Sequence, residues 1–342
     1  MIAEDRRPEP AIPLPRIGFL GVGWIGRHRM KALIDAGLVE AAAIADPSPE
    51  MAEEAGKLAP EAEILPSLQA MLDGGLDGIV IATPSALHAE QSIAVLERGI
   101  AVFCQKPLGR DAAEAAAVVE AARRADRLLG VDLSYRFTAA MTAIRERVAS
   151  GALGSVFAAD LVFHNAYGPD KPWFYDKALS GGGCVMDLGI HLVDLALWTL
   201  GFPEVTSVRS NLYAGGKPIE SPDQVEDFAD ATLTLASGAT VRISCSWRLH
   251  AGREAVIGAQ FYGTQGGAGF SNRAGSFYDF GAEAWKGTGS ELLAEPPDDW
   301  GGRAALDWAR RLRESKGYAP EAEELVMVSR VLDAIYRGRL QP

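Results

Sequence analysis

The 342-residue sequence has few cysteines and no long apolar run. Cys104, Cys184 and Cys245 lie far apart, and an odd number without a CxxC motif does not indicate a disulfide framework. Such sparse cysteines are typical of a reducing compartment. No apolar run is long enough to span a bilayer, and residues 1–13 are charged and proline-rich, unlike a signal peptide. We therefore expect a cytoplasmic protein with no membrane partner and a flexible tail over residues 1–13.

Positive charge is also scarce. Lysine and arginine number 33 against 45 aspartate and glutamate residues, which gives a net charge of −12. The densest basic patches, residues 27–29 and 310–313, are small. Because a strong negative field repels a phosphate backbone, we expect no nucleic-acid partner. The length is typical of two domains.

The first half of the sequence alternates between short apolar runs and helical stretches. Strand-like runs are expected at residues 17–22, 39–45, 63–65, 78–82, 101–104 and 128–133. Helices are expected between them at residues 25–36, 68–72, 86–97 and 111–125. This alternation predicts a doubly wound parallel sheet, buried on both faces, in a Rossmann domain over residues 14–134.

The second half has a different pattern. A helix at residues 138–149 is followed by longer, alternating runs, which are expected to be strands at residues 156–164, 205–212, 229–235, 240–247 and 254–262. Such runs are typical of an antiparallel sheet with one covered face. Residues 264–304 are rich in glycine and acidic residues and are expected to form loops, and residues 320–337 a final helix. We predict an α+β domain over residues 135–342.

A glycine-rich motif joins the first expected strand to the first expected helix. Residues 21–26 read GVGWIG, a GxGxxG pattern. Glycines at Gly21, Gly23 and Gly26 allow a tight turn and a close approach of the backbone to a pyrophosphate at the helix N-terminus. The strand–loop–helix context predicts dinucleotide binding, with Trp24 and Ile25 inside the motif.

Other polar residues follow the neighbouring strands. Asp46 ends the second strand, twenty residues after Gly26, where a carboxylate accepts hydrogen bonds from ribose hydroxyls and repels a 2′-phosphate. This favours NAD over NADP, although a turn residue before Pro47 would look the same. Thr83, Pro84 and His88 follow the fourth strand at the same edge, where ligands bind. His88 taken alone is also typical of a helix start.

The fifth expected strand ends in Gln105, Lys106 and Pro107. A lysine at this edge is expected to point toward the nicotinamide end of the cleft, where its ammonium would stabilise a developing alkoxide. An ordinary exposed lysine beside a turn is the alternative.

A second glycine-rich segment, residues 181–183, is expected to be a flexible approach to a helix. In that helix Asp187, His191 and Asp194 fall at i, i+4 and i+7, on one face. A histidine flanked by carboxylates is suited to general acid–base catalysis near neutral pH. A buried histidine with a capping aspartate and a metal site are the alternatives. No further histidine or cysteine cluster supports a metal, so we expect none.

These motifs together resemble the Gfo/Idh/MocA oxidoreductases, the relatives of glucose–fructose oxidoreductase and inositol 2-dehydrogenase. The resemblance extends from about Arg16 to the final helix, and it includes the segment Thr83 to His88, the QKP triplet and the GGGxxxDxGxHxxD segment. It implies a Rossmann domain and a second domain with a large open sheet, which commonly forms the subunit interface of dimers or tetramers. It also implies hydride transfer between a sugar or polyol carbon and a nicotinamide.

The resemblance also implies roles for single residues. Lys106 would bind the substrate hydroxyl, His191 would be the acid–base group, and Asp187 would orient it or contact substrate. The Tyr135–Phe137 segment resembles one in which the arginine, here Arg136, lies near the cofactor. One position departs from the family: Gln105 stands where a glutamate is usual, so one negative charge beside Lys106 is missing.

Polar and aromatic residues of the second half would suit a carbohydrate, and we select His164, Asn165 and Trp173 as candidate substrate contacts. The expected partner is a small sugar or polyol, bound by a homodimer or homotetramer. Two other functions stay open: a non-catalytic, dinucleotide-responsive regulator, and a glycosidase that uses NAD transiently.

Overall fold

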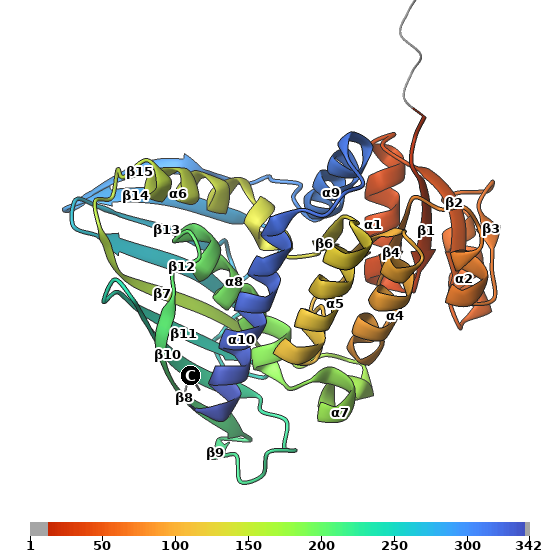
Figure 1. The fold of residues 1–342 in the computed structure, drawn as a ribbon. Helices are drawn as coiled ribbons and strands as arrows, with labels where there is room; N and C mark the ends of the chain where they lie inside the picture. The colour runs from red at the N-terminus through yellow and green to blue at the C-terminus, as the bar shows by residue number, and fades with distance from the viewer. Residues whose placement is uncertain (1–12, 339–342) are drawn as a thin grey trace, which may run out of the picture.

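The computed structural model describes residues 13–338, which contain two β-sheets that follow one another along the chain (Figure 1). The expected N-terminal tail lies, apart from Pro13, outside the described residues. The predicted fold class is confirmed. A parallel sheet flanked by helices is followed by a larger, mostly antiparallel sheet.

The first sheet has six strands, and every neighbouring pair is parallel. The strands are β1 (Arg16–Leu20), β2 (Glu40–Ala45), β3 (Glu63–Ile64), β4 (Gly78–Ile81), β5 (Ala101–Cys104) and β6 (Leu129–Val131). Their order, β3-β2-β1-β4-β5-β6, is that of dinucleotide-binding folds. The order reverses between β1 and β4, so a crevice is expected at their carboxyl ends.

Helices cover both faces of this sheet. Those that follow its strands are α1 (Trp24–Asp35), α2 (Pro49–Gly56), α3 (Leu68–Leu72), α4 (Ser85–Glu97) and α5 (Ala112–Ala125). Apolar residues of α1 and α2 pack on one face of the sheet, and those of α3, α4 and α5 pack on the other. Burial on both faces explains why the strands are continuous apolar runs.

The second sheet has nine strands in the order β15-β14-β13-β12-β7-β11-β10-β8-β9. They are β7 (Val156–Asn165), β8 (Val205–Ala214), β9 (Lys217–Pro218), β10 (Phe228–Leu235), β11 (Thr240–Ser246), β12 (Ala255–Gly263), β13 (Gly267–Asn272), β14 (Phe280–Lys286) and β15 (Gly289–Ala294). All neighbours are antiparallel except β7 and β11. Its core includes residues from α6 (Ala139–Ala149), α8 (Ile190–Thr199) and α10 (Glu323–Arg337).

The expectation of loops over residues 264–304 is wrong, because this segment contributes β13, β14 and β15. Its glycines allow close packing between strands. A Cβ atom on Gly269 would lie 2.2 Å from the Trp285 ring. Glycine within a strand therefore marks a close approach here, as it often does.

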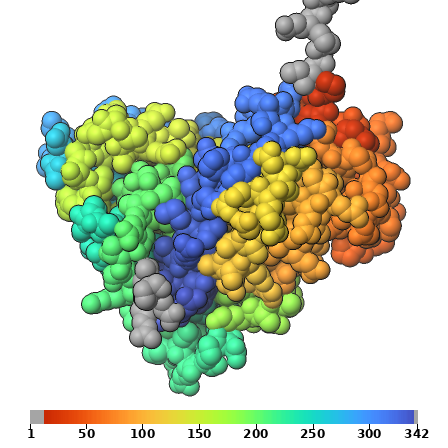
Figure 2. Space-filling view, viewed as in Figure 1, coloured from red at the N-terminus to blue at the C-terminus, as the bar shows by residue number. Residues whose placement is uncertain are grey.

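Helices from the end of the chain join the two halves. α9 (Arg303–Glu314), which the sequence analysis missed, returns to the first sheet, where Trp308 covers Gly78 and Gly130. α10, preceded by a short 3₁₀ turn at Pro320–Ala322, agrees with the helix expected at 320–337 and packs against both α5 and β8. Figure 2 shows it filling the seam between the two halves. The domain boundary between residues 134 and 135 stays a prediction. Helix α9 follows this boundary in the chain but packs against the sheet of the first domain.

One helical stretch, Lys177–Thr199, is long and apolar enough to cross a membrane by length and composition. It includes the short helix α7 (Lys177–Ser180) and α8, and most of it is buried inside the protein. The statement that no run is long enough therefore needs correction. This stretch is a core helix of the second half, which accounts for its apolar character.

Candidate active site

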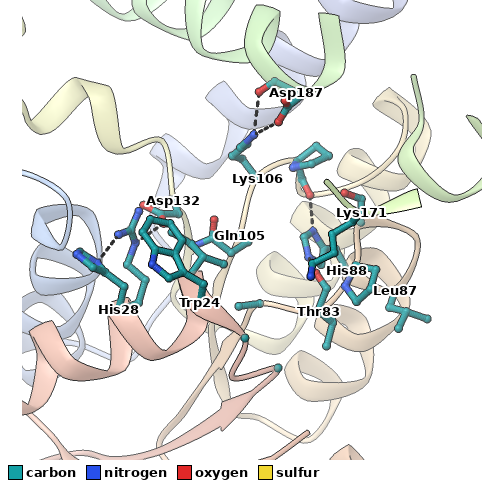
Figure 3. Close-up of a pocket in the computed structure, with 18 of the residues that line it drawn as sticks. Trp24, His28, Thr83, Leu87, His88, Gln105, Lys106, Asp132, Lys171 and Asp187 are labelled. Atoms are coloured by element: carbon teal, nitrogen blue, oxygen red, sulfur yellow. Dashed lines mark hydrogen bonds and ion pairs between the residues drawn. The ribbon is translucent and has the colours of Figure 1, made fainter. Parts of the chain in front are cut away.

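A cavity of about 1040 Å³ lies at the carboxyl edge of the parallel sheet. It is lined by the loops after β1, β2, β4, β5 and β6, and by residues of the second half around Asp187 and Trp300. Figure 3 shows Lys106 reaching toward Asp187 across this cavity. The position agrees with the crevice expected where the strand order reverses.

The three glycines of the first motif have three different tasks. Gly21 has a φ of +79°, which favours glycine, and a Cβ there would lie 2.7 Å from Ala82. A Cβ on Gly26 would lie 2.1 Å from the Gly21 oxygen, so α1 begins directly against the strand. Gly23 has no atom within 4 Å of its would-be Cβ, and its open side faces the cavity.

The N-terminus of α1 is left uncapped. Gly23 offers no side chain to cap the helix, and the first turn carries no acidic residue. The first backbone N–H groups of a helix lack intrahelical partners and attract anions. This end of the cavity therefore fits a pyrophosphate, and Trp24 and Ile25 line it. Their contact with a cofactor stays a prediction.

Asp46 lines the cavity where β2 ends. Its carboxylate accepts hydrogen bonds from the backbone N–H of Val22, at 2.8 Å, and of Ser48, at 2.9 Å. The residue therefore fixes the turn and the glycine loop. Carboxylate oxygens have further lone pairs, so a ribose hydroxyl remains an acceptable additional partner.

The loop after β4 is braced by His88. Its ring lies between two backbone oxygens, with Nδ1 2.6 Å from Pro107 and Nε2 2.7 Å from Thr83. The ring is buried, and this burial lowers the pKa of His88. Thr83 and Pro84 line the cavity as predicted, and His88 also ties their loop to the loop that carries Lys106.

Lys106 and Asp187 meet from opposite sides of the cavity. The Lys106 ammonium donates to the Asp187 carboxylate and to its backbone oxygen, both at 2.8 Å. The indole N–H of Trp247 donates to the other Asp187 oxygen at 3.1 Å. The lysine is thus oriented by a carboxylate eighty-one residues away in the chain.

Tight packing holds the segment that carries Asp187 in place. A Cβ on Gly182 or Gly183 would lie 1.9 Å from Tyr336 or from the Glu226 backbone, so these glycines are not a flexible approach. The buried carboxylate of Glu226 accepts hydrogen bonds from Gly183 and Val185. The expected flexibility is therefore corrected to a fixed support.

His191 is not flanked by carboxylates. Residues Val185–Gly189 form a π-helical turn, so spacing based on 3.6 residues per turn does not hold. Asp187 binds Lys106 and Trp247, and Asp194 binds Arg136. The sequence analysis expected both aspartates to flank His191. In the structure, each aspartate instead forms an ion pair with a different basic residue.

The His191 ring lies in an apolar and cationic setting. It packs against Tyr135, with ring centres 4.8 Å apart. Burial, followed by the charges of Lys106 and Arg29, holds the pKa of His191 well below its usual value. The ring is therefore neutral at pH 7.

A buried polar network that the sequence analysis missed lies beside Lys106. The Arg29 guanidinium donates to Asp132 at 2.5 Å, and the Gln105 side-chain amide donates to the same carboxylate. Ser134 donates to the other Asp132 oxygen at 2.6 Å. All four line the cavity. The available sequence signal was an aspartate at the end of a predicted buried strand.

The second half supplies aromatic walls. Trp173 lines the cavity as predicted and stacks on Phe174, with ring centres 3.9 Å apart. Tyr135, Tyr278 and Trp300 line it too, and the sequence analysis did not select them.

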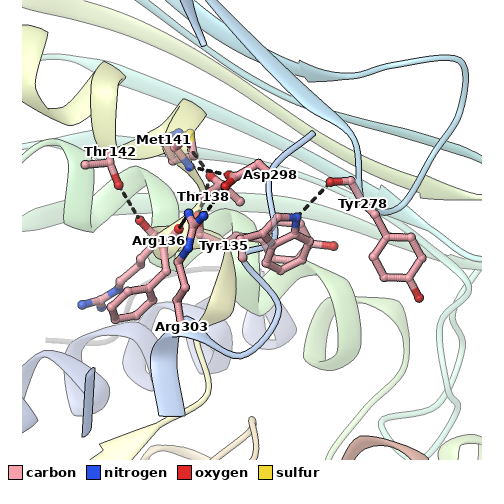
Figure 4. Close-up of polar contacts among 11 residues, drawn as sticks. Tyr135, Arg136, Thr138, Met141, Thr142, Tyr278, Asp298 and Arg303 are labelled. Carbon is pink, nitrogen blue, oxygen red and sulfur yellow. Dashed lines mark hydrogen bonds and ion pairs between the residues drawn. The ribbon is translucent and has the colours of Figure 1, made fainter. Parts of the chain in front are cut away.

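Three hydrogen bonds anchor the loop before α9. Trp300 donates to the Tyr278 backbone oxygen at 2.9 Å, and Asp298 accepts from Arg303 and from the backbone of Ala139 (Figure 4).

Four predicted site residues do not line the cavity: Gly26, which lies at the start of α1, Arg136, His164 and Asn165. The Arg136 side chain binds Asp194 and Glu324, under the aromatic rings of Trp198 and Phe202.

His164 binds Ser246 at 2.8 Å and stacks on Phe228. Asn165 ends β7 outside the lining. Within residues 13–338, no three or more metal-ligating side chains gather, and the absence of a metal stays a prediction.

Two family models match the chain. Residues 15–133 match an oxidoreductase family with an NAD-binding Rossmann fold, and residues 141–268 match the GFO/IDH/MocA C-terminal domain.

Curated relatives are similar at lower coverage. The chain is 29% identical to D-glucoside 3-dehydrogenase of Escherichia coli over 56% of this chain and 58% of that relative. It is 26% identical to levoglucosan dehydrogenase of Pseudarthrobacter phenanthrenivorans, over 73% of this chain and 72% of that relative. A putative UDP-kanosamine synthase oxidoreductase subunit of Amycolatopsis mediterranei is 30% identical over 71% of each chain.

Solved structures share the fold over nearly the whole chain. Levoglucosan dehydrogenase in complex with NADH has a TM-score of 0.82 at 22% identity, and covers 95% of this chain and 97% of that one. An aldose–aldose oxidoreductase from Caulobacter crescentus has the same score, identity and coverage.

Proposed function

The chain belongs to the Gfo/Idh/MocA family of oxidoreductases, and from this we propose that it is an NAD-dependent dehydrogenase of sugars, inositols or related polyols. The reaction transfers a hydride between a secondary alcohol carbon and the nicotinamide. One observation carries the proposal. Lys106, Asp187 and His191 line the same cavity as the uncapped glycine loop.

The cofactor would lie along the carboxyl edge of the parallel sheet. Gly21, Gly23 and the first turn of α1 would hold its pyrophosphate, and Asp46 the adenosine ribose. The nicotinamide end would then lie over β4 and β5, near Lys106. When bound, the nicotinamide ring accepts or returns the hydride. Solved neighbours hold NADH or NADP, and the Asp46 carboxylate supports NAD for this chain.

Lys106 and His191 would have different roles in the reaction, one in stabilising negative charge and the other in proton transfer. The Lys106 ammonium, oriented by Asp187, donates a hydrogen bond to the reacting oxygen and stabilises the negative charge that develops there as the hydroxyl proton leaves. Hydride departure from the carbon then turns this oxygen into a carbonyl oxygen. The neutral imidazole of His191 accepts the hydroxyl proton. In the reverse direction the same ring returns the proton to the new alcohol.

The relatives' names support the substrate class. Among them are dehydrogenases of D-glucosides, levoglucosan and inositol, which are all ring compounds with several hydroxyl groups. The aromatic walls around Trp173 and Trp300 suit the apolar faces of such rings. These named oxidoreductases favour a dehydrogenase over a non-catalytic sensor or an NAD-using glycosidase.

The proposal also covers the assembly and the location of the protein. Helices α6, α8 and α10 pack on one face of the nine-stranded sheet, and the opposite face carries exposed pairs such as Arg242 with Asp160. We propose that this open face joins subunits in a homodimer or homotetramer. The three free, buried cysteines support a cytoplasmic location. The net charge of −12 supports the absence of a nucleic-acid partner.

The test is absorbance at 340 nm with purified protein, NAD and a panel of inositols, aldoses and glycosides near pH 9. A parallel series contains NADP. Formation of NADH with one class of polyol is expected, and NADP is expected to be the poorer cofactor. Turnover with NADP alone would overturn the role of Asp46. Glycoside cleavage without net NADH would favour the glycosidase, and NAD binding without any turnover would favour the sensor.

A further inference from the structure

The network beside Lys106 consists of Arg29, Gln105, Asp132 and Ser134, and we call it the Asp132 network. Asp132 is 1% exposed and Arg29 6%, so their ion pair is buried. Gln105 can donate to Asp132 only because it carries an amide. A glutamate at this position would place two carboxylates against each other.

This inference rests on the proposed function, because it concerns the nicotinamide end of the cavity. The first strands hold the adenosine half of a dinucleotide and the later strands its nicotinamide half. Gln105 follows β5 and Asp132 follows β6, and both line the cavity. Gln105 is also the immediate neighbour of Lys106 in the chain.

The charges of the two ion pairs beside Gln105 cancel. Arg29 and Lys106 carry two positive charges, and Asp132 and Asp187 carry two negative charges in direct ion pairs with them. The nicotinamide ring is positively charged when oxidised and neutral when reduced. One added carboxylate in this group would attract the oxidised ring and leave the neutral, reduced ring almost unaffected.

We propose that Gln105, through Asp132 and Arg29, sets the relative affinity of this protein for oxidised and reduced cofactor. Because the Gln105 amide adds no charge, the two ion pairs beside it stay neutral as a group. The affinity for NADH, relative to that for NAD⁺, is therefore higher than it would be with a glutamate at this position. Gln105 is then a specificity-determining residue for the redox state of the cofactor. A chain with this site is suited to reducing a ketone as well as to oxidising an alcohol.

The test compares three variants that change the charge of the network in steps. Q105E adds one negative charge, D132N removes one, and the double variant Q105E/D132N moves the carboxylate without changing the net charge. The dissociation constant of NADH is measured from its fluorescence and that of NAD⁺ by calorimetry, without substrate. Work at pH 9 releases any proton shared by two carboxylates. Thermal melting of each variant checks the fold.

The ratio of the NAD⁺ to the NADH dissociation constant should follow the charge. Q105E is expected to lower this ratio by about tenfold, D132N to raise it by about as much, and the double variant to restore it to within about threefold. If one of the two single variants does not fold, the other still tests the direction in which the ratio of dissociation constants changes. Ratios that stay constant while both cofactors bind would overturn the inference alone. Failure of the wild-type protein to bind either cofactor would instead overturn the proposed function.

Discussion

The two ends of the cavity differ in which parts of the residues form them, backbone at one end and side chains at the other. The glycine-loop end is made of backbone: three glycines, a positive φ at Gly21 and the uncapped start of α1. The lysine end is made of side chains that come from distant parts of the chain. Lys106 meets Asp187 and Asp187 meets Trp247, across 81 and 60 residues.

This difference explains what each end can recognise. Backbone N–H groups at a helix start bind any phosphate of the right shape, so that end is suited to a cofactor shared by many enzymes. Side chains can be exchanged one at a time, so the lysine end is where substrate and redox preference are adjusted. We expect substitutions at the two ends to separate chemistry from cofactor binding.

The largest effect is expected at the lysine end. Lys106→Met keeps the length of the side chain and removes the donor that would stabilise the alkoxide. We expect kcat/KM to fall by at least about 10² to 10³-fold, with NADH affinity within a few-fold of wild type. Steady-state rates and NADH fluorescence measure the two quantities.

Lys57→Met is a matched control, because this exposed lysine pairs with Glu54 on α2, outside the cavity. It should leave both quantities unchanged. Equal losses of turnover and of NADH affinity in Lys106→Met would show that the lysine acts mainly in cofactor binding, and the division between the two ends would fail.

A smaller effect is expected at the glycine-loop end, from two alanine substitutions that differ in one respect. Gly23→Ala has room for its methyl group, so the protein should fold, and NADH should bind about tenfold or more weakly. Gly26→Ala places its methyl group 2.1 Å from the Gly21 oxygen, so stability should fall by about 1–3 kcal/mol as well. Urea unfolding and NADH titration distinguish the two. An unstable Gly23→Ala protein would mean that this glycine is structural.

The contrast between the two ends also explains which features of the site could be predicted from the sequence. Local patterns predicted the strands and helices of the first half, the glycine loop and the placement of Asp46, Thr83 and Lys106 at one edge. Each of these follows from residues close together in the chain. The pairing of Lys106 with Asp187 lay beyond local patterns, and the resemblance to a family supplied both residues.

The errors arose where local geometry departs from the regular case. Asp187 and Asp194 pair with Lys106 and Arg136 and not with His191, although all three residues lie close together in the chain. Glycines at Gly182 and Gly269 looked flexible but serve close packing. Arg29 and Asp132 meet across 103 residues, and nothing in either local pattern predicts that contact.

The smallest effect concerns the pH dependence of stability, and it tests the electrostatics of the lysine end. Burial, Lys106 and Arg29 lower the pKa of His191 in the folded protein, whereas in the unfolded chain it lies near 6.5. Between these two values the unfolded state binds the proton and the folded state does not. The stability that His191 contributes is therefore present above pH 6.5 and is lost as the pH falls below it.

His191→Phe replaces the ring by an apolar one in a pocket already lined by Tyr135 and Phe163. Taking the difference between wild type and variant at each pH cancels the contribution of every other group. That difference should change between pH 6.5 and 5 by about 1–2 kcal/mol, with the wild type losing more stability on acidification. Urea unfolding at a series of pH values measures it. A difference that is independent of pH would mean that the imidazole accepts a proton as readily in the folded site as in water, and the cationic surroundings assigned to it would have to be abandoned.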